Sequence, residues 1–355
     1  MSNYAKIAHY KHRETLLKHW RIGLLGAAVS LAAVYFVVSQ LDVRQLGDAF
    51  AQAHYIYLLP SAALIVLGLG ARAVRWRVLL SGGLPLNRAF SILNVAYLVN
   101  GVLPLRIGEV ARAYMATQVD PPVPFFKSTS TIIVERLLDL LAVLVISALA
   151  LTVAPLPDEL RAAALLFTPV VIVGFLALVL MASQRSRTLR LVDGITTRVP
   201  VMQRWNVAAL VGHFLDGLKP LTRPSALLNT LLWTAISWAF SLASGYVLML
   251  AFYNRADWAV TYLFTAAASF AVAVPAVPGN LGPYELSILL ALQAMGYGEP
   301  PEIATAFALV VHALNLGITA ILGVIGFIQE GVSLEQLTQG VRGVAQKANP
   351  PTPAS

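Results

Sequence analysis

The stretch LVNGVLPLRIGEVARAYM, from Leu98 to Met115, interrupts an apolar segment where a membrane-spanning helix would be expected to continue. Pro104 has no backbone N–H to donate and disfavours helix in the residue before it, so a continuous helix should end near Leu103. Three charged side chains follow within eight residues of the proline: Arg106, Glu109 and Arg112. A helix break next to charges in such an apolar setting predicts a polar site rather than a simple span.

The composition places the chain in a membrane. Of its 355 residues, 58% are hydrophobic and 12% charged, whereas soluble domains carry about 25% charged residues. The net charge of +8 falls in short segments between apolar stretches, which is typical of membrane topology and not of nucleic-acid binding. The chain has no cysteine and only scattered histidines, so we expect no disulfide, metal site or cofactor.

The apolar segments predict an all-α polytopic protein. A bilayer core needs roughly 20 apolar residues per helix, and about six full spanning helices satisfy this length: residues 22–39, 56–78, 129–153, 162–181, 226–252 and 303–328. Two shorter apolar stretches, 89–103 and 260–277, each end in a Pro/Gly break followed by a short helical segment, 108–118 and 284–295 respectively. The basic start resembles a signal peptide, but no clear cleavage site follows, so an uncleaved first helix is expected.

Loop charges predict the orientation, because basic segments remain in the cytoplasm. Residues 1–21 and 183–223 are basic, and the turns 155–160 and 298–302 are acidic and expected outside. This arrangement is consistent only if residues 89–127 begin and end in the cytoplasm and residues 259–301 begin and end outside. The two segments are therefore predicted to be re-entrant hairpins that enter from opposite sides of the membrane.

The predicted order makes the chain an inverted repeat. The halves, about 56–153 and 226–328, each read helix, hairpin, helix with opposite orientation, within a single transmembrane domain at 22–330 that is followed by a cytoplasmic tail at 331–355. The breaks LPLRIGE (103–109) and VPGNLGPYE (277–285) both place a glycine four residues after a proline, with a glutamate within three more. Paired interrupted segments in inverted halves point to the central site of a transporter.

The charges after each break predict the substrate-binding residues. A charge at membrane depth costs about 2.5–3.5 kcal/mol, so it needs a partner or a wet cavity. Arg106, Glu109 and Arg112 therefore predict a polar cavity in which an arginine and half-helix amides bind phosphate. The alternative is an interfacial turn with snorkelling arginines. In the second hairpin, Asn280 and Glu285 are the counterpart, with a helix cap on a surface turn as the alternative.

A polar group in the third span is expected to support this site. Glu135 and Asp139 lie four residues apart on one helical face, with Arg136 offset. Two such carboxylates repel unless a cation lies between them or one is protonated. Arg106 or Arg112 could supply the cation, either for function or as a purely structural pair.

Other polar residues are interpreted as structural. His312 and Asn315 are expected to form interhelical hydrogen bonds rather than to bind a ligand. Arg72, Arg75 and Arg77 with Trp76 are typical of an anchor at the membrane interface. The sequence contains no P-loop, HExxH or GxSxG motif.

Four motifs taken together resemble a known family. RAVRWRVLL (72–80), NGVLPLRIGEVARAYM (100–115), ERLLDL (135–140) and PAVPGNLGPYE (275–285) are similar in kind and order to the flippase-like family, also called the lysylphosphatidylglycerol synthase transmembrane-region family. The resemblance covers residues 21–330. In bifunctional members this domain moves an aminoacylated lipid across the bilayer and a soluble synthase domain follows; we expect this chain to be a stand-alone member without that domain. Asn280 replaces a glycine common in the family's second motif, which bears on the substrate.

The sequence and the resemblance together predict a lipid transporter of the inner membrane. Its expected substrate is a lipid with an anionic headgroup, moved between leaflets through a central polar cavity. Two alternatives remain open: a membrane-embedded transferase that uses a polyprenyl-phosphate-linked sugar, and a non-transporting scaffold for a partner lipid-modifying enzyme. The lipid, the direction of movement, a coupling ion and the oligomeric state are not predicted.

Overall fold

The fold is helical throughout the part of the chain that the structure describes. The computed structural model describes residues 42–103, 106–153, 179–196, 207–273 and 278–332, with isolated helical residues within 31–35, 169–177 and 335–339. Every element in these ranges is an α- or 3-10 helix, and no strand occurs among them. The predicted all-α class is confirmed for these residues.

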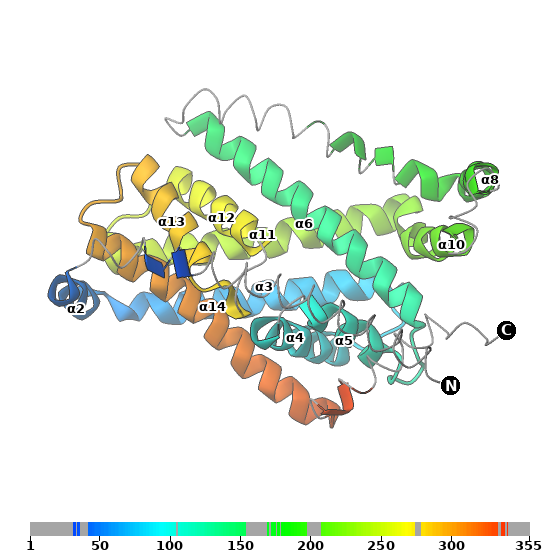
Figure 1. Cartoon of the computed structure of the whole chain (residues 1–355), viewed down its shortest axis with the longest axis horizontal. Coiled ribbons are helices and arrows are strands. Elements are labelled where there is room, and N and C mark those ends of the chain that lie inside the picture. The colour runs from blue at the N-terminus through cyan, green and yellow to red at the C-terminus, as the bar shows by residue number, and fades with distance from the viewer. Residues whose placement is uncertain are drawn as a thin grey trace, which may run out of the picture.

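The order of the helices along the chain can be followed by their colour in Figure 1. In chain order they are α2 Val43–Gln52, η1 Tyr55–Tyr57, α3 Leu58–Leu79, α4 Leu86–Val102, α5 Ile107–Ala116, α6 Phe125–Val153, α8 Arg185–Thr196, α10 Val207–Leu218, η3 Lys219–Thr222, α11 Pro224–Tyr253, α12 Trp258–Ala273, η4 Pro278–Asn280, α13 Pro283–Ala294 and α14 Pro301–Glu330.

Three predicted spans are confirmed as helices long and apolar enough to cross a membrane: Tyr55–Leu79, Pro224–Tyr253 and Pro301–Glu330. The predicted span 129–153 lies within α6. The predicted spans 22–39 and 162–181 fall largely outside the described residues. The described residues therefore contain three candidate membrane-spanning helices, as expected of a membrane protein.

Both predicted helix breaks are present. The first apolar stretch forms α4, and α5 follows after residues 103–106; the second forms α12, and α13 follows after η4. At a rise of 1.5 Å per residue, α4 and α12 are each only about 25 Å long, short of a hydrocarbon core of about 30 Å. Figure 1 places α4 and α5 in the half of the molecule that holds α8 and α10, and α12 and α13 in the half that holds α2.

Proline and left-handed residues set several helix ends. Pro224, Pro283 and Pro301 occupy the first turn of α11, α13 and α14, where the missing N–H costs nothing because that group has no intrahelical partner. Gly331 (φ 64°) follows α14 in the left-handed conformation that glycine adopts readily. These local signals explain why the ends of these helices were predictable to within a few residues.

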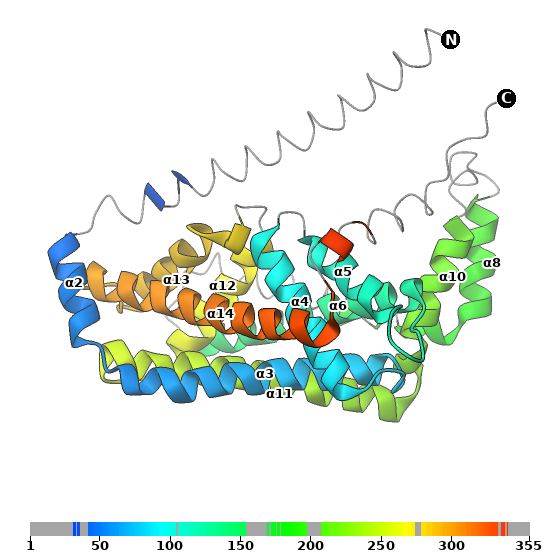
Figure 2. The same cartoon turned by 90° about the horizontal axis from the view of Figure 1, so that it is seen from below.

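Small residues allow the long helices to approach closely. α3 and α11 run side by side along the long axis of the molecule (Figure 2). Between them Ser61 Oγ lies 2.7 Å from Ser244 Oγ in a buried contact. α14 packs against α4, where a Cβ on Gly326 would lie 2.8 Å from the Ser91 carbonyl oxygen. Such small-residue contacts stabilise helix pairs in bilayers, where apolar burial alone gives little preference.

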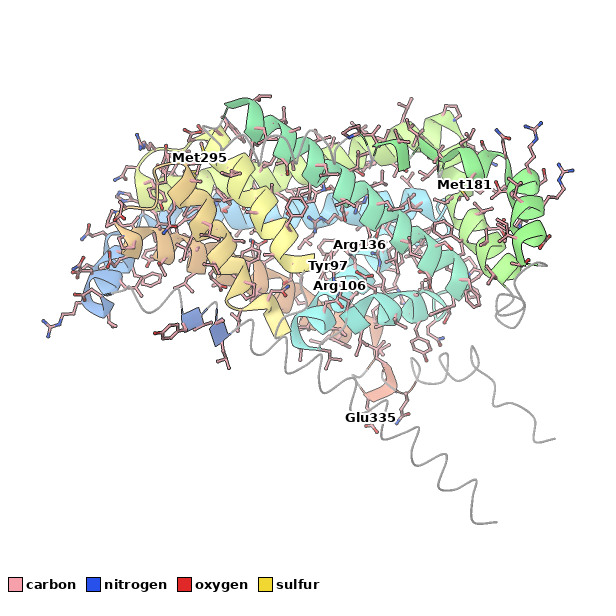
Figure 3. The ribbon with its side chains drawn as sticks, turned by 45° about the horizontal axis from the view of Figure 1, so that its top comes forward. Tyr97, Arg106, Arg136, Met181, Met295 and Glu335 are labelled. Carbon is pink, nitrogen blue, oxygen red and sulfur yellow. The ribbon has the colours of Figure 1, made fainter. Side chains whose placement is uncertain are left out.

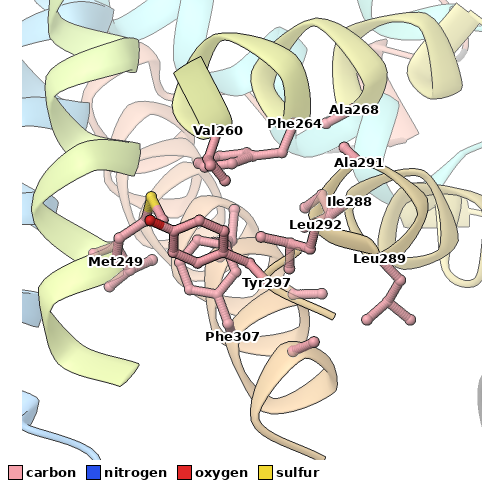
Figure 4. Packing of buried hydrophobic residues seen from close by; sticks show 14 of the residues in the cluster. Met249, Val260, Phe264, Ala268, Ile288, Leu289, Ala291, Leu292, Tyr297 and Phe307 are labelled. Atoms are coloured by element: carbon pink, nitrogen blue, oxygen red, sulfur yellow. The ribbon is translucent and has the colours of Figure 1, made fainter. Parts of the chain in front are cut away.

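Apolar packing joins the second short helix pair to its neighbours. Phe264 of α12, Ile288 and Leu292 of α13 and Phe307 of α14 are buried in one cluster with Met249 of α11 (Figure 4). Phe264 and Phe307 meet edge to face with centroids 5.3 Å apart. The cluster anchors α13 between α12 and α14.

Residues 183–223, expected as a cytoplasmic connection, contain the two helices α8 and α10. Arg185 of this segment pairs with Asp216 through contacts of 2.9 and 3.1 Å. α10 packs against α6 and α8, and its apolar residues face these helices. The helical spacing of apolar residues in VAALVGHFLDGL (207–218) is the sequence pattern that indicates this helix.

Candidate functional site

Charged side chains from three helices converge near the middle of the molecule. Tyr97, Arg106 and Arg136 lie together there, midway along its long axis (Figure 3). We call the group the central charge cluster, and its members are Arg72 and Arg75 of α3, Arg106, Glu109 and Arg112 at the start of and within α5, and Glu135, Arg136 and Asp139 of α6. Spacings of three or four residues on each helix direct these side chains to one face.

The base of the cluster is a buried ion pair. Arg112 donates to Glu135 through both terminal nitrogens, at 2.6 and 3.2 Å, and both side chains are 2% exposed. The guanidinium of Arg112 also lies over the ring of Trp76, 3.8 Å from its centroid. A bidentate pair with a stacked guanidinium requires arginine, because lysine has neither the planar fork nor the flat face.

Arg75 lies between the two carboxylates of α6. It donates to Asp139 at 2.7 and 3.3 Å, and its Nε lies 3.8 Å from Glu135. Trp238 of α11 also donates to Asp139, at 3.3 Å. The repulsion expected between Glu135 and Asp139 is therefore offset by Arg75 and Arg112.

The outer part of the cluster is partly exposed. Arg136 Nε lies 3.0 Å from Glu109, and Arg106 lies 4.0 Å from the same carboxylate. The side chain of Arg106 is 46% exposed and that of Arg136 is 35% exposed. Arg106 also donates to the Val272 carbonyl of α12 at 3.0 Å, so it connects the first helix break to the second short helix pair.

The cluster has more donors than the protein's own acceptors satisfy. Among the described residues, nothing accepts a hydrogen bond from the buried Nε atoms of Arg72, Arg75 and Arg112. The terminal nitrogen of Arg72 reaches Tyr97 Oη at 3.4 Å. Counted over the described residues, five arginines meet three carboxylates, an excess of two positive charges. Buried donors and unbalanced charge are costly, so the site favours an anion.

The backbone at the first helix break places Arg106 at the start of α5 and brings α5 close to α4. Arg106 caps α5 in the left-handed conformation (φ 53°), which is uncommon for a residue with a side chain. Gly108 lies so close to α4 that a Cβ would overlap the Ala96 carbonyl. Its amide donates to Asn100 Oδ1 at 2.8 Å and is therefore already occupied. The sequence also predicts free backbone amides after Pro104. Pro104 and Leu105 lie outside the described residues.

The second break holds a smaller polar group. Glu285, in the first turn of α13, accepts from the Gly282 amide at 2.8 Å and lies 2.6 Å from His312 Nδ1 of α14. Tyr284 stacks on the His312 ring at 4.3 Å. Asn280 has a left-handed backbone (φ 55°) at the end of η4, which packs against α4.

The structure brings together most of the predicted site residues. Arg106, Glu109 and Arg112 join the predicted supporting residues of α6 in one network. Asn280 and Glu285 lie on the other short helix pair, where Glu285 is bound to its own helix start and to His312.

The interpretation of residues 72–77 as an interface anchor is wrong for Arg75 and Trp76, which are 1% and 0% exposed. An Arg-Trp run in sequence does not distinguish an interface anchor from a buried pair, because the distinction lies in the partner helix. Tyr97 and Trp238 were also missed, since isolated aromatics in apolar helices carry no functional signal. Among the described residues no group of three or more possible metal ligands occurs.

Comparison with known proteins gives one curated relative. The chain is 23% identical over 344 residues to "Glycosyltransferase AglD" of Haloferax volcanii, in an alignment that covers 87% of this chain and 54% of the relative. The chain therefore spans about half the length of the curated relative that it matches. No solved structure matches.

A family model provides the stronger comparison. The model described as "Lysylphosphatidylglycerol synthase TM region" matches residues 23–323, most of the chain. This range contains both helix breaks and the whole central charge cluster, and it confirms the resemblance predicted from the four motifs. The protein belongs to the lysylphosphatidylglycerol synthase transmembrane-region family.

Proposed function

We propose that this protein moves a lipid with an anionic headgroup between the two leaflets of the inner membrane, and that the headgroup binds at the central charge cluster. The family match and the spanning helices support a lipid-related role in a membrane. The substrate class, the path and the location are our proposal. No partner protein is required for movement in this proposal.

The observation that carries the proposal is the excess of positive charge. Among the described residues two of the cluster's positive charges have no matching carboxylate, and the partly exposed Arg106 and Arg136 both face Glu109. Charges at membrane depth persist where they face a partner or water. A phosphate offers oxygens for several guanidinium donors at once, which suits the partly exposed side chains of Arg106 and Arg136.

The packing supports an inverted repeat with two re-entrant hairpins. In the proposed repeat, α3 corresponds to α11, α4 to α12, α5 to α13 and α6 to α14. Under this correspondence the contact of α4 with α14 becomes that of α12 with α6, and the contact of α5 with α6 becomes that of α13 with α14. All four of these helix pairs are in contact. In the proposed topology α4 and α5 enter from the cytoplasm and α12 and α13 from outside. The two breaks then meet near mid-membrane, where Arg106 contacts Val272.

This topology predicts the side from which single cysteines react, and the chain has no native cysteine to interfere. Asn87 and Gln118 lie exposed at the ends of the first helix pair, and Arg255 and Glu299 at the ends of the second. In intact cells, a membrane-impermeant maleimide should label cysteines at 255 and 299 but not at 87 and 118 until the membrane is opened. Labelling of all four from one side would contradict the inverted topology.

The function itself is tested with the purified protein alone in liposomes. Fluorescent phosphatidylglycerol in the inner leaflet should become accessible to external dithionite at a rate that rises with the number of proteins per vesicle. Protein-free vesicles and vesicles with heat-inactivated protein are the controls. If the lipid does not move in the absence of a partner, the transport proposal fails and a scaffold role is favoured.

A transferase is the second candidate, because the curated relative is named a glycosyltransferase. Glu109 is the more exposed carboxylate of the cluster, 24% against 15% for Asp139, and is the better placed acid or base. The same vesicles, supplied with a polyprenyl-phosphate-linked sugar and an acceptor, distinguish the two functions. Sugar transfer that Glu109→Gln abolishes would support the transferase.

A further inference from the structure

The second short helix pair carries a buried acid–base pair that the proposed lipid site does not use. Glu285 and His312 have side chains only 5% and 6% exposed. His312 is the twelfth residue of α14, about 17 Å from its start at 1.5 Å per residue, so it lies well inside the helix. Their separation of 2.6 Å is that of a strong hydrogen bond.

The hydrogen bonds define how this pair takes up a proton. Glu285 accepts from the Gly282 amide through one oxygen and faces His312 Nδ1 with the other. With Glu285 ionised, Nδ1 is the donor, and a further proton is carried on Nε2 of the imidazole. The unprotonated pair has a net charge of −1, and one proton from water makes it neutral. At membrane depth a net charge is costly, which gives the two states different stability in wet and dry surroundings.

The surroundings supply no fixed charge that would hold the pair in one state. α11 and α12 contain no Arg, Lys, Asp or Glu, and η4 contains none. Charged residues on the remaining helices packed against α13 and α14 are Arg44, Asp48, Arg72, Arg75, Arg77, Arg88, Glu302 and Glu330. Among the described residues none of these forms an ion pair with Glu285 or His312, and the titratable group in contact is Tyr284.

In the first helix pair the buried carboxylates are paired with arginine instead of histidine. There each carboxylate faces an arginine, as Glu135 faces Arg112, and arginine stays charged at every physiological pH. In the second pair the partner of the carboxylate is a histidine, a side chain that can bind and release a proton. Both pairs join the short return helix to the long helix that follows it, α5 to α6 and α13 to α14.

We propose that Glu285 and His312 form a proton-binding site, and that its occupation couples lipid movement to a proton. The neutral, protonated pair holds α13 against α14, and release of the proton from Nε2 to water leaves a charge that favours a wetter arrangement of the second helix pair. The coupling rests on the proposed lipid transport, whereas the proton site itself does not.

Direct titration tests the proton site without lipid movement. The full-length protein with isotope-labelled histidines in lipid nanodiscs gives imidazole signals, and the one lost in His312→Gln belongs to His312. Its chemical shift should respond to pH, and the response should differ in Glu285→Gln. A signal that does not change with pH while the protein stays folded, or that changes identically in Glu285→Gln, overturns the proton site.

Coupling is tested in liposomes with a pH difference across the membrane. Fluorescent phosphatidylglycerol should reach an unequal distribution between leaflets, and the inequality should reverse with the gradient. His312→Gln, which keeps a donor for Glu285 but cannot take up a proton, should give equal distribution, while His54→Gln, at an exposed position, should behave as the parent. Equal distribution in the parent, or unchanged inequality in His312→Gln, overturns the coupling. If no lipid moves at all, the transport proposal and the coupling fail, and the titration still decides the proton site.

Discussion

Arg112→Ala is expected to cause the largest loss of stability of any single substitution in the cluster. It leaves Glu135 buried, with Arg75 Nε 3.8 Å away as its remaining cation. Breaking a buried ion pair by removing one partner costs about 3–5 kcal/mol, a large part of the 5–15 kcal/mol that typically stabilises a folded domain. The measurement is thermal unfolding in detergent, together with the amount of folded protein recovered from membranes.

An exposed pair of the same chemistry provides the matched control. Arg185 and Asp216 form a two-contact pair with side chains 47% and 49% exposed. Pairs at this exposure contribute about 0–1 kcal/mol, so Arg185→Ala should melt close to the parent. The double variant Arg112→Leu/Glu135→Leu should recover much of the loss, because no unpaired charge remains. If Arg112→Ala melts with the parent, the buried pair is not a stabilising element.

Arg106→Gly is expected to abolish most lipid movement while leaving the fold intact. The substitution removes a guanidinium whose interactions, among the described residues, are one hydrogen bond to Val272 and a 4.0 Å ion pair, from a side chain that is 46% exposed. Glycine also adopts the left-handed backbone at this position without strain. Loss of a charge-assisted hydrogen bond of about 1.5–3 kcal/mol corresponds to a roughly ten- to hundredfold lower rate. The paired measurement is translocation in liposomes and melting temperature for the same preparation.

The companion variant separates charge from geometry. Arg106→Lys keeps the charge but cannot grip a phosphate with two parallel hydrogen bonds, so its translocation rate should fall between those of the parent and Arg106→Gly. A structural role for Arg106 would instead lower the melting temperature together with the rate. Normal translocation in Arg106→Gly would mean that Arg106 is only a snorkelling anchor.

Local signals in the sequence predict the helix breaks and most of the charge cluster. Pro104, Pro278 and Gly282 restrict or loosen the local backbone by themselves. The end of α4 and the start of α13 can therefore be predicted without tertiary information. The spacing of Glu135 and Asp139 on one helical face requires a cation nearby, and Arg112 was one of the two candidates named for it.

The partners supplied by distant helices could not be predicted. Arg75 reaches Asp139 from 64 residues away, and Trp238 reaches the same carboxylate from 99 residues away. Such contacts depend on how α3 and α11 pack against α6, which no local spacing encodes. The hydrogen bonding expected of His312 is present, but its partner Glu285 is set by the packing of α13 on α14.

The dependence of translocation on headgroup charge tests the central claim most directly. In liposomes containing only the purified protein, phosphatidylglycerol and phosphatidylcholine with the same fluorescent acyl chain differ in net headgroup charge and not in their tails. The excess of two positive charges in the central cluster predicts that the anionic lipid moves on the order of ten times faster, a difference of about 1.4 kcal/mol, and that Arg106→Gly removes the preference. Equal rates for the two lipids in the parent would contradict a headgroup site built on the arginines.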